Sequence, residues 1–267
     1  MEKKKPQLGQ NFLVSATAQA AIVDALGDVS ARTVVEIGPG RGALTSLLAA
    51  RAGRLIGVEL DRDLAARLRT EFAERENVEI RHEDVLETDF TALRGGGERL
   101  MVVGNLPYYI TSNILLRLFR YADEIERGVV MLQREVAERV AAEPGGREYG
   151  ALSATAQLYA RVERLMTLPP GAFSPPPQVH STVVRLTMAP RFRDLGVEPE
   201  GFLAFVRACF AQKRKMLGKN LRNAGYAADA VTAALAASGV AATARAEAVG
   251  LEKMAAVWEQ LCGKSRA

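Results

Sequence analysis

The chain has 267 residues, of which 48% are hydrophobic and 25% are charged, and its formal net charge is +4 at pH 7. This composition predicts a globular protein with a substantial core and excludes a disordered or fibrous chain, while the mildly basic charge suits a polyanionic partner. No apolar run reaches the ~18 residues of a membrane span and no signal peptide is recognisable, so we expect a cytoplasmic protein without membrane contact. Two cysteines and two histidines share no metal-ligand spacing, and no metal site is predicted.

The N-terminal segment combines a basic arm with a polar stretch. Residues 1–6 carry three lysines and are expected to be a solvated tail. The following stretch places the amides of Gln10 and Asn11 beside Phe12 and Leu13, directly before a helix predicted over residues 15–26.

A glycine-dense turn follows the first predicted strand, residues 33–37. Gly38, Gly40 and Gly42 lead into a helix that continues to about residue 51. A strand, a glycine turn and a helix in this order form the nucleotide-binding half of a doubly wound α/β fold. The spacing is neither that of a dinucleotide-binding turn nor that of a P-loop, so a cofactor without a pyrophosphate fits better. Glu36 could help to hold a cationic ligand.

Polar residues also end the next two predicted strands. Glu59 follows the strand at residues 54–58, at an offset from Gly38 where nucleotide folds accept ribose hydroxyls. After the strand at residues 78–82, Asp84 could accept a hydrogen bond from an adenine amino group, with Val85 packed on the ring. Each acid alone is more often a helix cap or a solvated loop residue, but together they mark the ligand-binding edge of an open sheet.

The fourth strand ends in Asn105, Leu106, Pro107 and Tyr108. Pro107 fixes its own φ and restricts Leu106 to extended conformations, so the Asn105 side chain and the two following carbonyls can converge on one point. Two acceptors that take the hydrogens of a nucleobase amine, with Tyr108 stacked on the ring, would favour the pyramidal nitrogen needed for attack. An ordinary strand-end turn with a buried tyrosine is the alternative.

The next part of the chain continues the α/β pattern. Helices are predicted over residues 111–119 and 134–142, strands over residues 128–133, 162–168 and 181–186, and the loop at 143–150 is either a lid or an inert surface loop. The proline-rich segment 169–179 presents Phe173, which could be a second stacking face opposite Tyr108 around an extruded base. The alternative is a stiff linker packed by one phenylalanine.

The pattern becomes helical from about residue 191. We predict domains at 1–190 and 191–267, with a helix over residues 200–217 that runs into a basic segment. Candidate phosphate contacts in this segment are Lys213, Arg214, Lys215, Lys219 and Arg222. Lys215, Lys219 and Arg222 share one face if the helix continues through Gly218, although a solvated charged face is the usual meaning of such a run.

Four segments together resemble the ribosomal RNA adenine dimethyltransferases, and the similarity extends over nearly the whole chain. They are residues 10–13 (Gln-Asn-Phe-Leu), 36–42 (Glu-Ile-Gly-Pro-Gly-Arg-Gly), 105–108 (Asn-Leu-Pro-Tyr) and 173–179 (Phe-Ser-Pro-Pro-Pro-Gln-Val). The resemblance is to the small-subunit, kasugamycin-sensitivity branch. It implies a Rossmann-like class I S-adenosylmethionine-dependent methyltransferase fold with a small all-α C-terminal domain. The implied reaction is N6,N6-dimethylation of two adjacent adenines in a stem-loop near the 3′ end of small-subunit ribosomal RNA.

The resemblance also implies roles for individual residues. By position, the cofactor contacts are Gln10, Asn11, Leu13, Gly38, Glu59, Asp84, Val85 and Asn105, and the target-adenine site is Asn105, Leu106, Pro107, Tyr108 and Phe173. The expected partner is small-subunit ribosomal RNA within a pre-subunit particle, and the expected state is a monomer. Two alternatives stay open: an RNA-binding or transcription cofactor without catalysis, and a large-subunit dimethylase of the antibiotic-resistance type.

Overall fold

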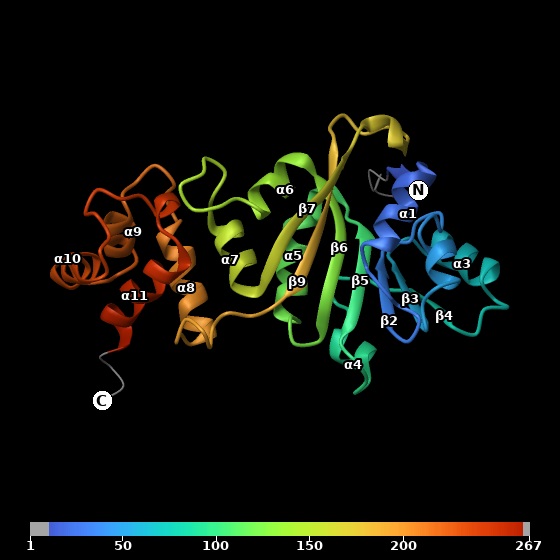
Figure 1. The fold of residues 1–267 in the computed structure, drawn as a ribbon, viewed down its shortest axis with the longest axis horizontal. Helices are drawn as coiled ribbons and strands as arrows, with labels where there is room; N and C mark the ends of the chain where they lie inside the picture. Colours follow the sequence, from blue (N-terminus) through green and yellow to red (C-terminus); the bar gives the residue numbers. More distant parts are fainter. Residues whose placement is uncertain (1–10, 264–267) are drawn as a thin grey trace, which may run out of the picture. The chain divides into compact units, whose positions relative to one another are not determined.

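The computed structural model describes residues 11–263 and divides into two compact units (Figure 1). Among these residues, the sheet unit comprises residues 11–137 and Arg161–Met188, and the helical unit comprises Glu138–Ala160 and residues 189–263. No helix in the described part of the chain is long and apolar enough to cross a membrane.

The sheet unit is built on a seven-stranded sheet in the order β4-β3-β2-β5-β6-β9-β7. The strands are β2 (Thr33–Ile37), β3 (Arg54–Glu59), β4 (Val78–His82), β5 (Leu100–Asn105), β6 (Ile125–Gln133), β7 (Ala160–Leu168) and β9 (Ser181–Met188). The strands from β4 to β6 in this order run parallel to one another, and β9 runs antiparallel to β6. All seven lie where the sequence predicts strands. The apolar runs of β2, β3, β5, β6 and β9 are largely buried, whereas β4 and β7 at the two ends of the strand order are more exposed.

The chain reverses its direction of winding between β2 and β5. It proceeds outward from β2 through β3 to β4 and then returns to β5, which pairs with the other side of β2. Ile37 lies opposite Gly104 in this pair, so the turn after β2 and Asn105 at the end of β5 are neighbours at one edge of the sheet. Open α/β sheets bind ligands at such a point.

The helices of the sheet unit are α1 (Ala16–Asp24), α2 (Thr45–Ala49), α3 (Arg62–Glu71), α4 (Phe90–Arg94), α5 (Thr111–Arg120) and α6 (Arg134–Val140), whose last residues enter the helical unit. Polar side chains cap the starts of α1, α3 and α4. Asp61 accepts hydrogen bonds from the amides of Asp63 and Leu64 at the start of α3, and Asp89 does the same at the start of α4. These bonds satisfy amides that have no partner within the helix.

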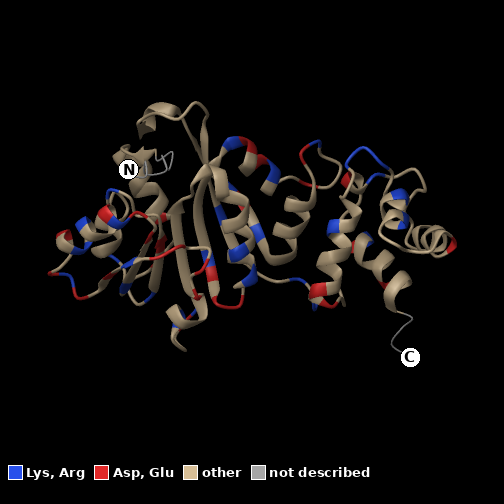
Figure 2. Cartoon of the chain, turned by 180° about the vertical axis from the view of Figure 1, so that it is seen from behind, with Lys and Arg blue, Asp and Glu red and all other residues tan. Residues whose placement is uncertain are grey.

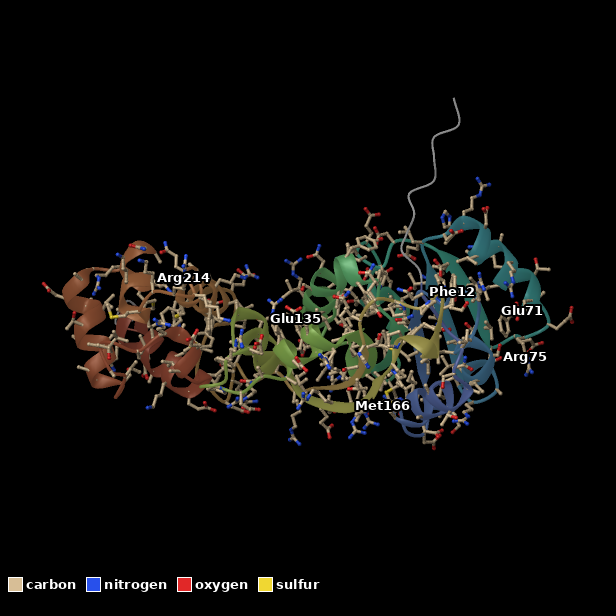
Figure 3. The ribbon with its side chains drawn as sticks, turned by 90° about the horizontal axis from the view of Figure 1, so that it is seen from above. Phe12, Glu71, Arg75, Glu135, Met166 and Arg214 are labelled. Carbon is tan, nitrogen blue, oxygen red and sulfur yellow. The ribbon has the colours of Figure 1, made fainter. Side chains whose placement is uncertain are left out.

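Two short strands tie the N-terminal segment to the proline-rich segment. β1 (Phe12–Leu13) pairs antiparallel with β8 (Phe173–Ser174), so that Leu13 lies opposite Phe173. The Val14 amide extends this contact by donating to the carbonyl of Ala172 at 2.8 Å. This long-range pairing fixes residues 11–14, which line a pocket with the carboxyl ends of the strands. Phe12 is labelled in Figure 3.

The helical unit consists of α7 (Ala151–Tyr159), α8 (Pro199–Cys209), α9 (Leu217–Asn223), α10 (Ala228–Ala237) and α11 (Leu251–Cys262). Its core contains stacked rings of Phe202 and Phe205, 6.0 Å apart, and α7 adds Ala154 and Leu158 to the same cluster. This shared core explains why Glu138–Ala160 groups with the C-terminal helices, whereas the sequence suggests one boundary near residue 190.

The predicted helix over residues 200–217 is corrected by the structure, since α8 ends at Cys209 and α9 begins at Leu217. The buried side chain of Asn220 donates to the carbonyls of Cys209 at 2.6 Å and Gln212 at 3.2 Å. These carbonyls would otherwise face the next turn of a continuing helix, so the chain turns through residues 210–216 instead.

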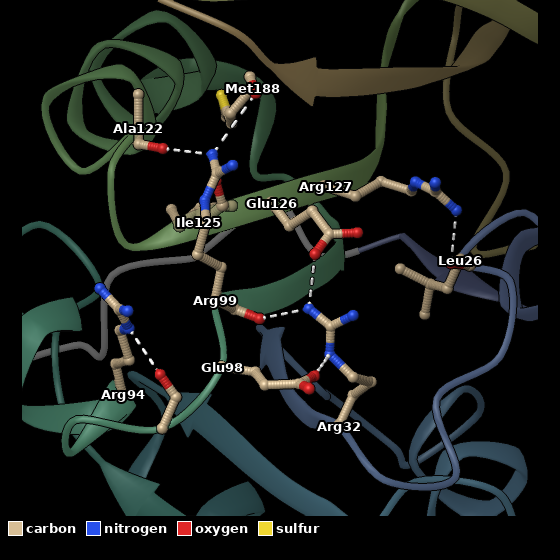
Figure 4. Close-up of polar contacts among 11 residues, drawn as sticks. Leu26, Arg32, Arg94, Glu98, Arg99, Ala122, Ile125, Glu126, Arg127 and Met188 are labelled. Atoms are coloured by element: carbon tan, nitrogen blue, oxygen red, sulfur yellow. Dashed lines mark hydrogen bonds and ion pairs between the residues drawn. The ribbon is translucent and has the colours of Figure 1, made fainter.

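Two arginines bind the strand ends that lie opposite the glycine turn, at the starts of β2, β5 and β6 (Figure 4). Arg99 donates to the carbonyls of Ala122, Ile125 and Met188. Arg32 donates to the Arg99 carbonyl and to Glu126, both at 2.7 Å, and its hydrogen bond lowers the pKa of Glu126. The polar groups at these strand ends are therefore engaged in hydrogen bonds within the protein.

Candidate active site

A pocket of about 190 Å³ lies at the carboxyl ends of the parallel strands, in the sheet unit. The glycine turn after β2, the ends of β3 and β5, the loop after β4 and residues 11–14 line it. Ten of the residues that the resemblance assigns to the cofactor or the target adenine lie in this lining: Asn11, Leu13, Gly38, Glu59, Asp84, Val85, Asn105, Leu106, Pro107 and Tyr108. Gln10 lies outside the described residues. No group of three or more His, Cys, Asp or Glu within residues 11–263 could hold a metal ion.

The glycine turn lets a ligand approach the backbone. Gly38 has φ +64°, a region that side chains rarely adopt, and a Cβ placed there would meet no protein atom within 4 Å. It would instead occupy the open pocket. Gly40 has φ +60°, and a Cβ there would lie 3.0 Å from the Phe12 ring. The turn therefore requires glycine both for its conformation and for close approach.

Phe12 is held between the glycine turn and an arginine. Its ring packs against Gly40, and the guanidinium carbon of Arg41 lies 4.4 Å from the ring centroid. A guanidinium at this distance attracts the ring through a cation–π interaction. Together with the pairing of β1 and β8, this contact fixes the N-terminal wall of the pocket.

Glu59 is a buried carboxylate held by two backbone amides. Gly40 donates to Oε2 and Asp61 donates to Oε1, each at 2.9 Å, and only 3% of the residue is exposed. A carboxylate oxygen has two lone pairs, so both oxygens can still accept a hydrogen bond from a hydroxyl in the pocket. Glu59 thus combines a fixed position with free acceptor capacity.

Glu36 is more deeply constrained than the sequence suggests. Its Oε2 accepts a hydrogen bond from the Thr45 hydroxyl at 2.7 Å, and the residue is 2% exposed. Burial raises the pKa of Glu36 to about 7, and the charge of Glu59 contributes to the same shift. The carboxyl therefore keeps its proton to higher pH than a solvated glutamate, which makes it a weaker partner for a cation.

Asp84 and Val85 form another part of the wall. Asp84 Oδ1 accepts from the Leu86 amide at 2.8 Å, which fixes the loop after β4. Val85 is buried and lines the pocket beside it. An acceptor next to an apolar surface fits a planar ring that carries an amino group.

The Asn105 side chain has one defined orientation. Its Nδ2 donates to the backbone carbonyl of Asn11 at 2.7 Å. A carbonyl oxygen can only accept, so the amide must present its nitrogen to Asn11 and direct Oδ1 the other way. Asn105 therefore supplies one oriented acceptor to the pocket.

The Pro107 carbonyl has a structural role that the sequence did not indicate. It accepts from the Thr111 hydroxyl at 2.9 Å and from the Ile110 amide at 3.2 Å. Both of its lone pairs are used in closing the turn before α5. The expectation that both following carbonyls act as acceptors is corrected for Pro107, and Leu106, which lines the pocket, remains the candidate for the backbone acceptor.

Tyr108 is half-buried, and its hydroxyl lies 2.6 Å from Ser181 Oγ at the start of β9. Burial raises the pKa of Tyr108, so the phenol stays protonated. Ser181 is fully buried. Sequence reasoning missed Ser181 and Thr111 as supports of the site, although each is a polar residue at the start of an otherwise apolar element.

Phe173 is packed in the core, as in the alternative interpretation of the proline-rich segment, and not placed as a stacking face in the pocket. The side chain is 3% exposed and belongs to the hydrophobic cluster that includes Leu13 and Ala172, and it is not among the described residues that line the pocket. Because β8 pairs with β1, Phe173 is packed opposite Leu13 and its ring offers no open face. The aromatic residues of the lining are Phe12, Tyr108 and Tyr109.

The basic candidates lie in the helical unit, on the turn after α8 and on α9 (Figure 2). Lys213, Arg214, Lys215, Lys219 and Arg222 are all exposed, and Arg214 is labelled in Figure 3. Lys219 and Arg222 share α9, whereas Lys215 precedes it. Lys213 Nζ donates to the carbonyl of Arg147 at 3.1 Å, which brings the loop at 143–150 to this basic surface.

Comparison with known proteins points to one family. Residues 1–261 match the family described as ribosomal RNA adenine dimethylase. The chain is 62% identical to ribosomal RNA small subunit methyltransferase A of Acidobacterium capsulatum, over 98% of this chain and 93% of that protein. It is 53% identical to the protein of the same name from Koribacter versatilis, over 97% and 94% of the two chains.

Solved structures share the fold over nearly the whole chain. The 23S rRNA methyltransferase ErmE aligns with a TM-score of 0.73 and 28% identity, covering 94% of this chain and 99% of that one. A dimethyladenosine transferase from Plasmodium falciparum aligns with a TM-score of 0.82 and 21% identity, covering 95% and 98%. The predicted fold class, a Rossmann-like methyltransferase fold, is confirmed.

Proposed function

The chain belongs to the ribosomal RNA adenine dimethylase family, and we propose on this basis that it dimethylates the N6 amino groups of two adjacent adenines in small-subunit ribosomal RNA. The methyl donor is S-adenosylmethionine, and the target is a stem-loop near the 3′ end of the RNA. The observation that carries the proposal is the Asn105 amide, whose orientation leaves Oδ1 as an acceptor in the pocket that Leu106 also lines.

The pocket residues fit S-adenosylmethionine. Gly38 leaves room for a ligand at the backbone, and the fixed carboxylate of Glu59 can accept both hydroxyls of its ribose. Asp84 can accept from the adenine amino group of the cofactor, with Val85 against the ring. Asn11 and Leu13 close the pocket from the N-terminal side. When bound, the cofactor supplies an electrophilic methyl group, so the protein requires neither a covalent nucleophile nor a metal.

The protein's task is to orient the target amine. Asn105 Oδ1 and the Leu106 carbonyl accept its two N–H groups, which favours a nitrogen whose lone pair is free to attack. Pro107 fixes the Leu106 carbonyl, and Tyr108 stacks on the adenine ring, held in place by Ser181. After the first transfer the amine retains one hydrogen, so the second transfer uses only one of the two acceptors.

The helical unit supports a role in holding RNA. Its exposed residues Lys213, Arg214, Lys215, Lys219 and Arg222 can contact phosphates, which position a structured RNA without reading its sequence. We propose that the protein acts as a monomer in the cytoplasm on a pre-subunit particle.

Methylation of isolated ribosomal subunits tests the proposal. Protein is incubated with labelled S-adenosylmethionine and unmethylated small subunits or large subunits, and the RNA is digested and analysed for N6,N6-dimethyladenosine. We expect two dimethyladenosines per small subunit and none on large subunits. Dimethylation of large subunits alone would move the protein to the antibiotic-resistance branch, and cofactor or RNA binding without transfer would favour a non-catalytic role.

A further inference from the structure

Exposed apolar side chains gather at the mouth of the pocket. Five large hydrophobic residues are exposed within the described chain, and Val14, Leu60 and Tyr109 among them line the pocket. Single exposed hydrophobic residues are ordinary on a protein surface, but several at one opening indicate contact with a ligand. Tyr109 is the most open of them, with 63% of its surface exposed.

The other aromatic residues near the pocket are already engaged. Arg41 covers the ring of Phe12, and the hydroxyl of Ser181 holds Tyr108 half-buried. Phe173 is packed in the core. Tyr109 follows Tyr108 in the same short turn, η1 (Tyr108–Ile110), and its ring is open to solvent. It is therefore the aromatic side chain of the lining that can offer a free face to a further group outside the target-adenine site.

The substrate supplies such a group. If Tyr108 stacks on an adenine extracted from the RNA, the adjoining nucleotide loses its stacking neighbour and exposes the face of its base to water. We propose that Tyr109 forms a second base subsite, in which its ring stacks on the nucleobase that adjoins the target adenine. This inference rests on the proposed function and adds a binding site for the neighbouring nucleotide.

Stacking of one base on an aromatic side chain changes affinity by about 5- to 150-fold. The subsite therefore compensates part of the cost of extracting the target adenine. Since the two target adenines are adjacent, each can serve as the neighbour of the other. Tyr109 would then contribute to both dimethylation events without touching the reacting nitrogen.

A double-mutant cycle between protein and RNA tests the subsite. Wild type and Tyr109→Ala are assayed for kcat/KM on a stem-loop RNA with two adjacent adenines and on the same RNA with an abasic ribose at the neighbouring position. We expect Tyr109→Ala and the abasic substitution each to lower kcat/KM by about 5- to 150-fold. Combining them should cause little further loss. Multiplicative losses, in which the two effects are independent, would overturn the proposal.

Further variants at position 109 distinguish stacking by an aromatic ring from a contact that any apolar side chain could make. Tyr109→Phe should retain wild-type kcat/KM, and Tyr109→Leu should behave like Tyr109→Ala. Val179→Ala, which removes an exposed hydrophobic side chain outside the pocket lining, is the matched control and should leave kcat/KM unchanged. If Tyr109→Leu were as active as Tyr109→Phe, any apolar side chain at this position would suffice, and the stacking proposal would be wrong.

A binding experiment covers the case in which the isolated stem-loop is a poor substrate. The RNA carries 2-aminopurine at the neighbouring position, and its fluorescence is recorded on binding in the presence of S-adenosylhomocysteine. Stacking on Tyr109 should quench the fluorescence in wild type and in Tyr109→Phe but not in Tyr109→Ala. Equal signals in all three would refute the subsite. Failure of the proposed function is distinct, because wild-type protein would then leave small subunits unmethylated.

Discussion

Asn105 Nδ2 donates a hydrogen bond of 2.7 Å to the carbonyl of Asn11, and this bond joins the end of β5 to the N-terminal wall of the pocket. Asn11 is held in turn by the neighbouring strand β1, which pairs with β8. The side chain that we propose to orient the target amine is thus fixed by a segment that lines the same pocket. One hydrogen bond couples the two halves of the site.

Replacing Asn105 by alanine should abolish most of the transfer. The pocket loses the oriented acceptor Oδ1, and loss of one such group in a site shielded from water costs on the order of 10²–10³ in rate. Affinity for S-adenosylmethionine should change much less, because Gly38, Glu59 and Asp84 remain. Single-turnover methylation at saturating cofactor measures the first effect and calorimetry the second. Near wild-type transfer would contradict the role of Asn105.

Ser181 should act only through Tyr108. Ser181→Ala removes the hydroxyl that lies 2.6 Å from the tyrosine, and we expect kcat/KM for RNA to fall roughly 2- to 10-fold, the value of one hydrogen bond. Cofactor affinity should not change. In a Tyr108→Phe background the Ser181→Ala substitution should have no additional effect on kcat/KM, since its partner is absent. A full additional loss there would assign Ser181 a different function.

Glu59 should matter for the cofactor. Glu59→Ala leaves two ribose hydroxyls without a charged acceptor and should weaken binding by about 1.5–3 kcal/mol. It also frees the amides of Gly40 and Asp61, so Glu59→Gln, which keeps the shape and can satisfy one amide, is the matched variant. Calorimetric titration with S-adenosylmethionine measures the cofactor affinity of the two variants. Unchanged affinity in the alanine variant would refute the ribose contact.

Glu36 should make stability depend on pH. Its pKa is about 7 in the folded protein, because the carboxyl is buried, whereas the value for a solvated glutamate, as in the unfolded chain, is 4.5. Between these values the folded protein retains a proton that the unfolded chain has lost, so the free energy of unfolding falls as pH rises from 4.5 to 7. The shift corresponds to a loss of about 3 kcal/mol over this range.

The Glu36→Gln variant isolates this effect. Glutamine can still accept from the Thr45 hydroxyl, but it does not titrate. Urea denaturation at several pH values should show the wild type losing stability relative to the variant as pH rises to 7. Parallel stability curves would mean that Glu36 titrates as an ordinary carboxyl.

The sequence predicted the parts of the site that depend on local pattern. Apolar strands followed by Gly38, Glu59, Asp84 and Asn105 are visible along the chain, and parallel strands bring their carboxyl ends to one edge. The structure departs from the prediction where long-range contacts decide. Phe173 faces the core because β8 pairs with β1, which no local periodicity reveals.

The same distinction explains the helical unit. Periodicity suggested a helix through residue 217, but the buried Asn220 captures the carbonyl of Cys209 and the helix ends there. The helix α7 was not predicted, since its small residues lack a clear apolar stripe. Its burial against α8 becomes evident only in the folded unit.

The basic surface of the helical unit yields the last prediction. Lys215, Lys219 and Arg222 are exposed, and replacing all three by alanine should remove phosphate contacts without touching the cofactor site, which lies in the sheet unit. On the counterion-release estimate the slope of log affinity against log salt should flatten by about 2 to 3 units. Lys253→Ala, at an exposed lysine of α11, is the control and should leave the slope unchanged. Titration of small-subunit binding against salt measures the slopes; identical values for wild type and triple variant would mean that these side chains are only solvated and that the RNA is held elsewhere.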